Sequence, residues 1–144
     1  MAIVVLGALL FSSAAQACTC LEMSPRAALR QADGAVSARL IQIDPVDRYG
    51  ADYLYRVRRV YKPGPGLRAG ETVSVHSGIN GASCGLPDDN ARWYGLFLSR
   101  REGQWSGGLC GIAPPREIAA AARALRRGDE LASPVADSTP DCAS

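Results

Sequence analysis

The sequence has few of the residues on which most catalytic and metal sites depend. Among 144 residues there is one histidine, and aromatic residues make up 6% of the chain. No H-E-x-x-H, G-x-S-x-G or phosphate-binding loop occurs, so the common hydrolase and nucleotide-binding signatures are absent. We therefore expect a protein that is not an enzyme and that has no cofactor of its own. The one histidine, His76, is expected to be a surface or hydrogen-bonded residue.

A large charge of one sign is also lacking. Sixteen Lys and Arg stand against fourteen Asp and Glu, which leaves a formal charge of +2. A dedicated polyanion binder normally carries a larger basic excess, so this class is excluded. The hydrophobic content of 47% is too high for a disordered chain, and the length suits one domain. Nine Pro and fifteen Gly indicate many turns rather than long helices.

Long hydrophobic runs are absent, apart from a short one at the start. The apolar run at residues 2–11 is too short to span a bilayer, and Ala15-Gln16-Ala17 after it is an A-x-A cleavage pattern. We expect residues 1–17 to be a secretory signal peptide, with a buried strand or helix as the alternative. The mature protein would be secreted or periplasmic, would begin at Cys18, and would have paired cysteines.

The cysteines are few but distinctively placed, at Cys18, Cys20, Cys84, Cys110 and Cys142. A bridge between Cys18 and Cys20 would close a strained ring, so each should pair with a distant partner. Cys84 and Cys110 are the natural partners, while Cys142 is left over. Two pairings remain open, because spacing does not choose between them.

Two bridges so close together would fix the direction of the N-terminus as well as its position. Chain ends normally fray, and stability alone needs only one bridge. We infer that the terminus itself is the functional part. Simple anchoring of the first strand, or a redox role for the Cys-x-Cys pair, are the alternatives.

Hydrophobic alternation predicts five short strands between two helices. Ser24-Pro25 should start a first helix that ends near Asp33-Gly34, and Pro114-Pro115 should start a second one that ends at Gly128. The strands are expected at residues 35–43, 53–61, 71–77, 93–99 and 104–110. Their inward side chains are expected to include Val36, Ala38, Leu40, Tyr53, Tyr55, Val57, Val73 and Val75. The helix face expected to pack on the barrel consists of Ile118, Ala121, Ala122 and Leu125.

This order of elements predicts an all-β fold with peripheral helices. The five-stranded Greek-key OB-fold barrel, with the C-terminal helix packed on it, is the best match in size and strand count. A sandwich is the alternative, because periodicity does not distinguish the two. Residues 18–128 should form the domain, and residues 129–144 a polar disordered tail.

Three motifs together resemble a known family. They are Cys18-Thr19-Cys20 after the signal cut, Ser83-Cys84-Gly85 in a loop, and Cys110-Gly111-Ile112-Ala113-Pro114 before a helix. The chain resembles the N-terminal netrin-like domain of the tissue inhibitors of metalloproteinases, as a single-domain, bacterial-type member. The resemblance covers residues 18–128, and it implies the disulfides Cys18–Cys84 and Cys20–Cys110.

The resemblance also implies a function, the inhibition of zinc metalloendopeptidases by a monomer. The backbone amine and carbonyl of Cys18 would ligate the catalytic zinc of the target, which keeps one coordination position open for water. Thr19 would enter the specificity pocket, and Cys20 and Leu21 would extend along the cleft. Ala82, Ser83 and Cys84 would fill the other side of the same ridge.

The sequence departs from the family pattern in several places. The family's third bridge has no counterpart, since Arg30 stands where one cysteine is expected and Cys142 has no evident partner. We expect no counterpart of the family's second, disulfide-rich domain. Most of the long first hairpin loop is missing between Ile43 and Tyr53. The contacts that select a target are therefore expected to differ.

Three other functions fit parts of the sequence. A lipoprotein would be anchored to a membrane through Cys18, which would remove the free amine. A noninhibitory netrin-like adaptor would need no free terminus. A nucleic-acid or sugar-binding OB domain could use Arg56, Arg58, Arg59 and Lys62 among tyrosines. Export and the low net charge speak against nucleic acid as the partner.

Overall fold

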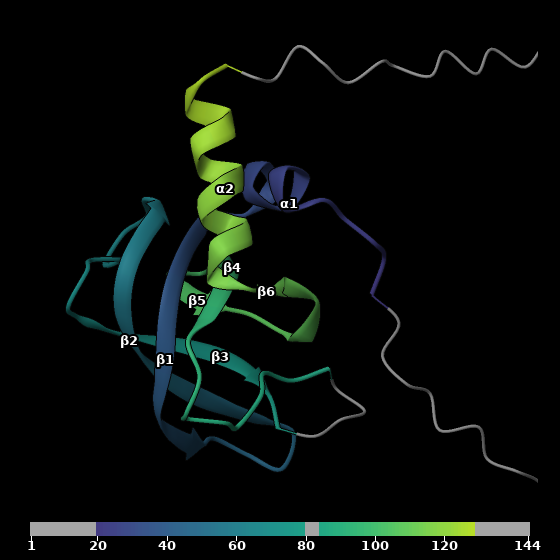
Figure 1. Cartoon of the computed structure of the whole chain (residues 1–144). Helices are drawn as coiled ribbons and strands as arrows, with labels where there is room; N and C mark the ends of the chain where they lie inside the picture. Colours follow the sequence, from purple (N-terminus) through teal and green to yellow (C-terminus); the bar gives the residue numbers. More distant parts are fainter. Residues whose placement is uncertain (1–19, 80–83, 129–144) are drawn as a thin grey trace, which may run out of the picture.

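Five strands close into a barrel, and two helices lie against it (Figure 1). The computed structural model describes residues 20–79 and 84–128. The OB-like barrel with peripheral helices that the sequence predicts is the fold of the chain. Its elements are α1 (Pro25–Gln31), β1 (Gly34–Pro45), β2 (Gly50–Lys62), β3 (Thr72–Gly78), β4 (Tyr94–Arg101), β5 (Gln104–Ser106), the 3-10 helix η2 (Leu109–Gly111), β6 (Ile112–Ala113) and α2 (Pro115–Arg126).

The strand order explains why the sheet is a barrel and not a sandwich. Strands follow one another as β1-β2-β3-β5-β4-β6, and β1 also pairs with β4, which closes the ring. All of these pairs are antiparallel except β3 with β5, which run parallel and join Val75 to Trp105. Closure leaves β1 with a partner on both sides and so protects it from pairing with other chains.

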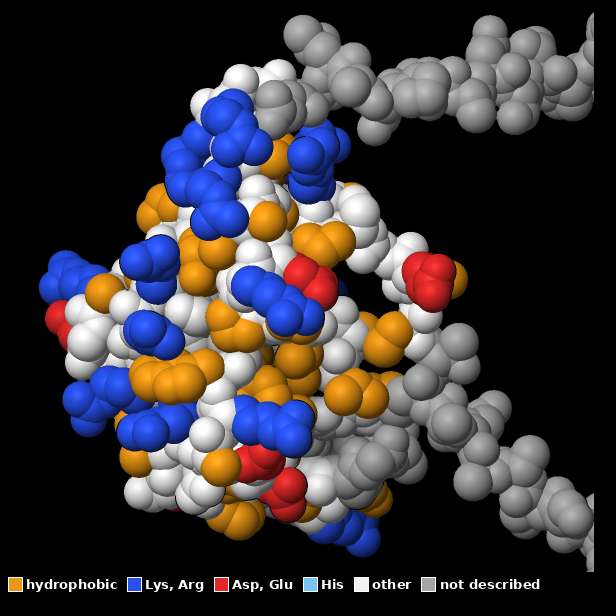
Figure 2. Space-filling model, in the orientation of Figure 1, with side chains coloured by type: hydrophobic (Ala, Val, Ile, Leu, Met, Phe, Trp, Pro, Cys, Tyr) orange, Lys and Arg blue, Asp and Glu red, His pale blue; other side chains and the backbone are white. Residues whose placement is uncertain are grey.

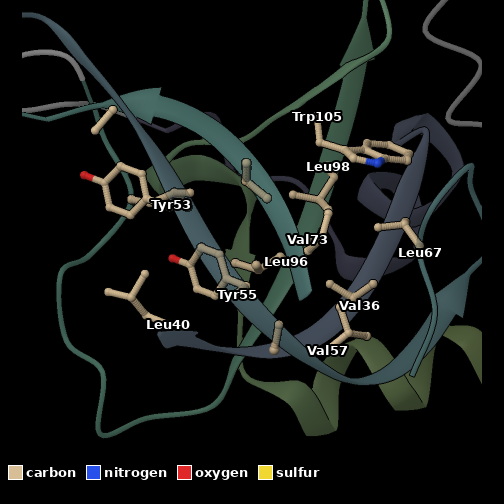
Figure 3. Packing of buried hydrophobic residues seen from close by; sticks show 14 residues of the cluster. Val36, Leu40, Tyr53, Tyr55, Val57, Leu67, Val73, Leu96, Leu98 and Trp105 are labelled. Atoms are coloured by element: carbon tan, nitrogen blue, oxygen red, sulfur yellow. The ribbon is translucent and has the colours of Figure 1, made fainter. Parts of the chain in front are cut away.

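Alternation along the strands sorts the side chains as the sequence predicts. The inward residues of the first three strands are all buried, and they meet in one apolar core (Figure 3). Outward neighbours such as Arg56 and Arg58 are exposed. The core consists of Val36, Ala38, Leu40, Ala51, Tyr53, Tyr55, Val57, Leu67, Val73, Val75, Leu86, Leu96, Leu98 and Trp105. Val and Leu supply most of this core, together with two tyrosines and one tryptophan.

The connection between the first two strands is much tighter than the predicted loop at residues 44–52. Only residues 46–49 lie between β1 and β2. The carboxylate of Asp47 accepts hydrogen bonds from the backbone N–H groups of Tyr49 (2.7 Å) and Gly50 (2.8 Å). These two bonds lower the pKa of Asp47 and close the turn. Both strands therefore extend further into this region than their hydrophobic pattern indicates.

The two helices pack on each other and on one end of the barrel (Figure 1). The hydroxyl of Ser24 caps α1 by accepting the N–H of Ala27 (3.2 Å), as its position predicts. A second apolar cluster joins both helices to β1 and contains Leu29, Ala35, Ile118, Ala121 and Ala122. No helix in the described ranges is long and apolar enough to cross a membrane.

The predicted strand at residues 104–110 is wrong in its second half. Strand β5 ends at Ser106, and the N–H of Gly107 donates to the carbonyl oxygen of His76 (3.1 Å). After Gly108 the chain turns into η2, which carries Cys110, and then into β6, a two-residue strand that the sequence pattern does not reveal. The Gly-Gly pair breaks the strand because it offers no side chain to pack and permits a sharp change of direction.

Candidate functional site

The N-terminal segment is tied to the barrel at Cys20. A disulfide joins Cys20 to Cys110, with 5.3 Å between their Cα atoms, and it links positions 90 residues apart. This is the pairing that the resemblance implies for Cys20. Chain-entropy arguments give a loop of this size about 4–5 kcal/mol of stabilisation. The bond holds a segment that would otherwise have little to keep it on the surface.

Cys110 is a rigid anchor because the barrel holds the chain on both sides of it. On one side, the N–H of Gly111 donates to the carbonyl oxygen of Gly108 (2.9 Å) and closes the single turn of η2. On the other side, β6 pairs with β4, with Ile112 opposite Leu96 and Ala113 opposite Gly95. A terminus attached to Cys110 is therefore attached to the core sheet.

Cys84 lies directly beside this anchor. The N–H of Leu109 donates to the carbonyl oxygen of Cys84 (2.8 Å), so the two cysteine-bearing segments are joined by a backbone hydrogen bond. Cys84 has a φ of 53°, in the left-handed region that residues other than glycine seldom adopt. Cys84 is itself disulfide-bonded. The pairing expected for it, with Cys18, lies outside the described residues.

The close approach of these segments depends on small residues. A Cβ atom added at Gly85 would collide with the carbonyl oxygen of Gly78, and one at Gly108 would lie 2.9 Å from the carbonyl oxygen of Cys84. The hydroxyl of Ser77, which is buried, accepts the N–H of Leu86 (3.1 Å) and fixes the chain after the loop. Any larger residue at Gly85 would push the Cys84 segment away from the sheet.

A shallow groove and several exposed apolar side chains surround the two cysteines. The groove has a volume of about 370 Å³ and is lined by both cysteines and by the glycines at 78, 107, 108 and 111. Three large apolar residues here are exposed: Leu109 in the lining (45%), Ile79 next to Gly78 of the lining (39%), and Leu21 next to the disulfide-bonded Cys20 (90%). Apolar side chains gathered in this way are typical of a surface that binds another protein.

The structure brings together only part of the predicted site. Cys20 and Cys84 are described and lie at adjacent anchors, and Leu21 follows Cys20 with its side chain almost fully in solvent. Cys18, Thr19, Ala82 and Ser83 lie outside the described residues.

Sequence reasoning missed Ile79 and Leu109 as members of this edge. The only signal for Leu109 was the Gly-Gly pair before it, which places it in a turn instead of a strand.

The other candidates for chemistry have structural roles. His76 lies 2.9 Å from Asp52, Nδ1 to Oδ1, in a partly exposed pair on neighbouring strands. Asp89 accepts the N–H of Ala91 (2.8 Å) and pairs with Arg92 (3.2 Å), so it stabilises a turn. Within the described ranges no group of three or more His, Cys, Asp or Glu side chains could hold a metal ion.

Comparison of the sequence with protein-family models and with curated proteins finds no match. The features that indicate a function are therefore the geometry of the anchored N-terminal segment and the motifs of the sequence.

Proposed function

We propose that this protein is a secreted inhibitor of zinc metalloendopeptidases that presents its own N-terminus to the target's catalytic zinc. The observation that carries the proposal is the juxtaposition of the two anchors. The Cys20–Cys110 disulfide and the hydrogen bond from Leu109 to Cys84 bring both expected attachment points of Cys18-Thr19-Cys20 to one edge of the barrel.

The chemistry follows from the properties of a terminal amine. Its pKa is near 7.7–8.0, so a useful fraction is neutral at physiological pH and has a free lone pair. The amine and carbonyl of Cys18 would close a five-membered chelate ring on the zinc and displace the water that performs hydrolysis. The zinc belongs to the target, and the inhibitor contributes only the ligands.

Rigidity makes such a terminus an effective ligand. A loose chain end loses conformational freedom when it binds, at a cost of about 1–2 kcal/mol for each residue that is ordered. A disulfide on a barrel-held 3-10 turn removes much of this cost before the target is met. Thr19 would then enter the specificity pocket, with Leu21 following along the cleft.

The exposed apolar residues beside the anchors support a protein partner. Leu21, Ile79 and Leu109 are exposed in the free protein and would be buried when the edge enters a cleft. Ala82 and Ser83 immediately precede Cys84 and would lie on the same side of the ridge. A protein interface needs such an apolar centre, surrounded by polar groups.

The test is an inhibition assay of the secreted protein against a panel of zinc endopeptidases, together with a variant that has one alanine added before Cys18. The extra residue moves the amine away from the metal, so we expect inhibition to weaken at least about 100-fold. A variant with one alanine added after Ser144 is the matched control and should inhibit like the natural chain.

N-terminal sequencing and an intact mass keep the outcomes distinct. Equal potency of the two alanine variants would refute zinc ligation by the amine. A lipid mass on Cys18 would identify a lipoprotein, because an acylated amine cannot chelate zinc. A free Cys18 without inhibition of any protease in the panel would favour the noninhibitory adaptor.

A further inference from the structure

The low net charge of the chain is the sum of two oppositely charged parts. All sixteen Lys and Arg lie within the described ranges 20–79 and 84–128, together with ten of the fourteen Asp and Glu. Sixteen against ten gives this part a formal charge of +6. The other four acidic residues all lie in residues 129–144, where there is no basic residue. The folded domain is thus clearly basic.

Much of this positive charge lies on one face, away from the cysteine edge. Figure 2 shows Lys and Arg side chains spread over the side of the molecule formed by α2 and the outer surfaces of β1 and β2. We call this surface the basic face. It consists of Arg39, Arg58, Arg59, Lys62, Arg116 and Arg126, with Tyr61 and Trp93 between them.

Shared neighbours show that the basic face is continuous. The guanidinium groups of Arg39 and Arg58 both lie over the ring of Trp93, at 5.3 and 5.4 Å from its centre. Trp93 and Arg58 also line a pocket of about 210 Å³ with Arg59, Arg116 and Tyr61.

Tyr61 in turn lines a second pocket, of about 450 Å³, together with Lys62 and Arg126. The two hollows therefore lie on either side of one tyrosine, and cations border both of them.

Within the described part of the chain, no carboxylate forms an ion pair with a residue of the basic face. No Asp or Glu lines either pocket. The ion pairs seen there involve Arg68, His76 and Arg92, none of which belongs to the basic face. Lys62 is positioned by two helix-end carbonyls, since its Nζ donates to the backbone oxygens of Leu29 (3.0 Å) and Arg30 (2.9 Å). The face thus has positive charge available for a ligand.

We infer that the basic face binds an acidic polysaccharide, a flexible single chain that carries sulfate or carboxylate groups. Guanidinium groups match such anions because they donate two parallel hydrogen bonds to one oxyanion. Two adjacent hollows with cationic borders suit anions repeated along one chain. This function is independent of the proposed inhibition, because the basic face does not include the cysteine edge.

Two other polyanions fit the face less well. Single-stranded nucleic acid binds by stacking its bases on open aromatic rings, whereas two arginines already lie over Trp93. A membrane surface is bound by cations together with exposed apolar anchors. None of the exposed large apolar side chains of the described residues lines either pocket of the basic face.

The test measures binding of the full chain to a heparin decasaccharide at low and at physiological salt. We expect binding that weakens steeply with salt, because bound cations are released from a polyanion when the protein replaces them. The triple variant R58Q/R59Q/R116Q should bind at least about 10-fold more weakly, and its salt dependence should fall by about three ionic contacts.

The matched control is R48Q/R68Q/R101Q, which removes the same charge from exposed positions outside the basic face. It should bind within about threefold of the natural chain. Equal losses in the two variants would overturn the inference, because net charge alone would then explain binding. Tighter binding of a single-stranded oligonucleotide of equal charge, or of phosphatidylglycerol vesicles, would overturn it in favour of those partners.

Unchanged thermal unfolding and protease inhibition in R58Q/R59Q/R116Q would show that the fold and the cysteine edge are intact.

Discussion

Tyr55 has the least satisfied side chain in the core. Its ring is fully buried among Val, Leu and Tyr residues, and its hydroxyl is the one buried side-chain polar atom of the described residues without a hydrogen-bond partner. Burial raises the pKa of Tyr55 far above its usual value, so the group stays neutral. A buried hydroxyl without a partner opposes folding, because it has lost its hydrogen bonds to water.

We predict that Tyr55→Phe stabilises the protein by about 1 kcal/mol, since the ring still fills the core and the unsatisfied hydroxyl is removed. Urea unfolding measures the change. Tyr53→Phe is the matched control, because the hydroxyl of Tyr53 donates to the carbonyl oxygen of Gly78 (3.2 Å). It should lose about 0.5–1.5 kcal/mol. Destabilisation by both substitutions would show that the Tyr55 hydroxyl has a partner in solution.

At the scale of elements, the loop that carries Cys84 is positioned by backbone contact and not by side-chain packing. Gly85 touches the carbonyl of Gly78 at the end of β3, and the Cys84 carbonyl accepts a hydrogen bond from the start of η2. The segment therefore depends on one small residue for its place beside Cys110.

Gly85→Ala is predicted to cost about 1–3 kcal/mol, because the added methyl group forces backbone against backbone. Gly128→Ala is the comparison, since its Cβ meets nothing and only its φ of 72° is unfavourable, which costs about 1 kcal/mol. Thermal unfolding ranks the two. A smaller loss at Gly85 than at Gly128 would mean that the Cys84 segment moves aside freely.

The elements that the sequence predicts well are those long enough for the hydrophobic pattern to repeat several times. Strands around Val36, Tyr55, Val75 and Leu96 and both helices are where alternation and capping residues place them. The elements that it misplaces are short or depend on backbone contacts. Strand β6 has two residues, too few for any period, and the turn at Asp47 is closed by hydrogen bonds that no alternation records.

The sequence also did not predict which residues of the site lie next to one another. Cysteine spacing left the pairing of Cys20 open, and only the family resemblance implied Cys110 as its partner. The basic face was missed because the summed charge of the chain includes four acidic residues beyond residue 128. A net charge carries no information about where charges lie, which depends on how β1, β2 and α2 come together.

For the whole molecule, the Cys20–Cys110 disulfide constrains the chain by linking two positions 90 residues apart. We predict that Cys20→Ala with Cys110→Ala lowers the free energy of unfolding by about 4–5 kcal/mol, because a loop of 90 residues is no longer closed in the unfolded state. Guanidinium unfolding gives the value. Cys142→Ala, a cysteine without an evident partner in the sequence, is the control and should change stability by less than about 0.5 kcal/mol. A double variant that fails to fold would agree with the prediction, whereas a loss below about 1 kcal/mol would contradict it.

The same link also sets an order in time. Cys20 emerges early during synthesis, but its partner follows 90 residues later, roughly 5–18 s at ordinary elongation rates. Until Cys110 is made, the thiol of Cys20 has no native partner and could react with other thiols. The segment at Cys20 thus reaches its final arrangement among the last, once nearly all of the barrel has been made.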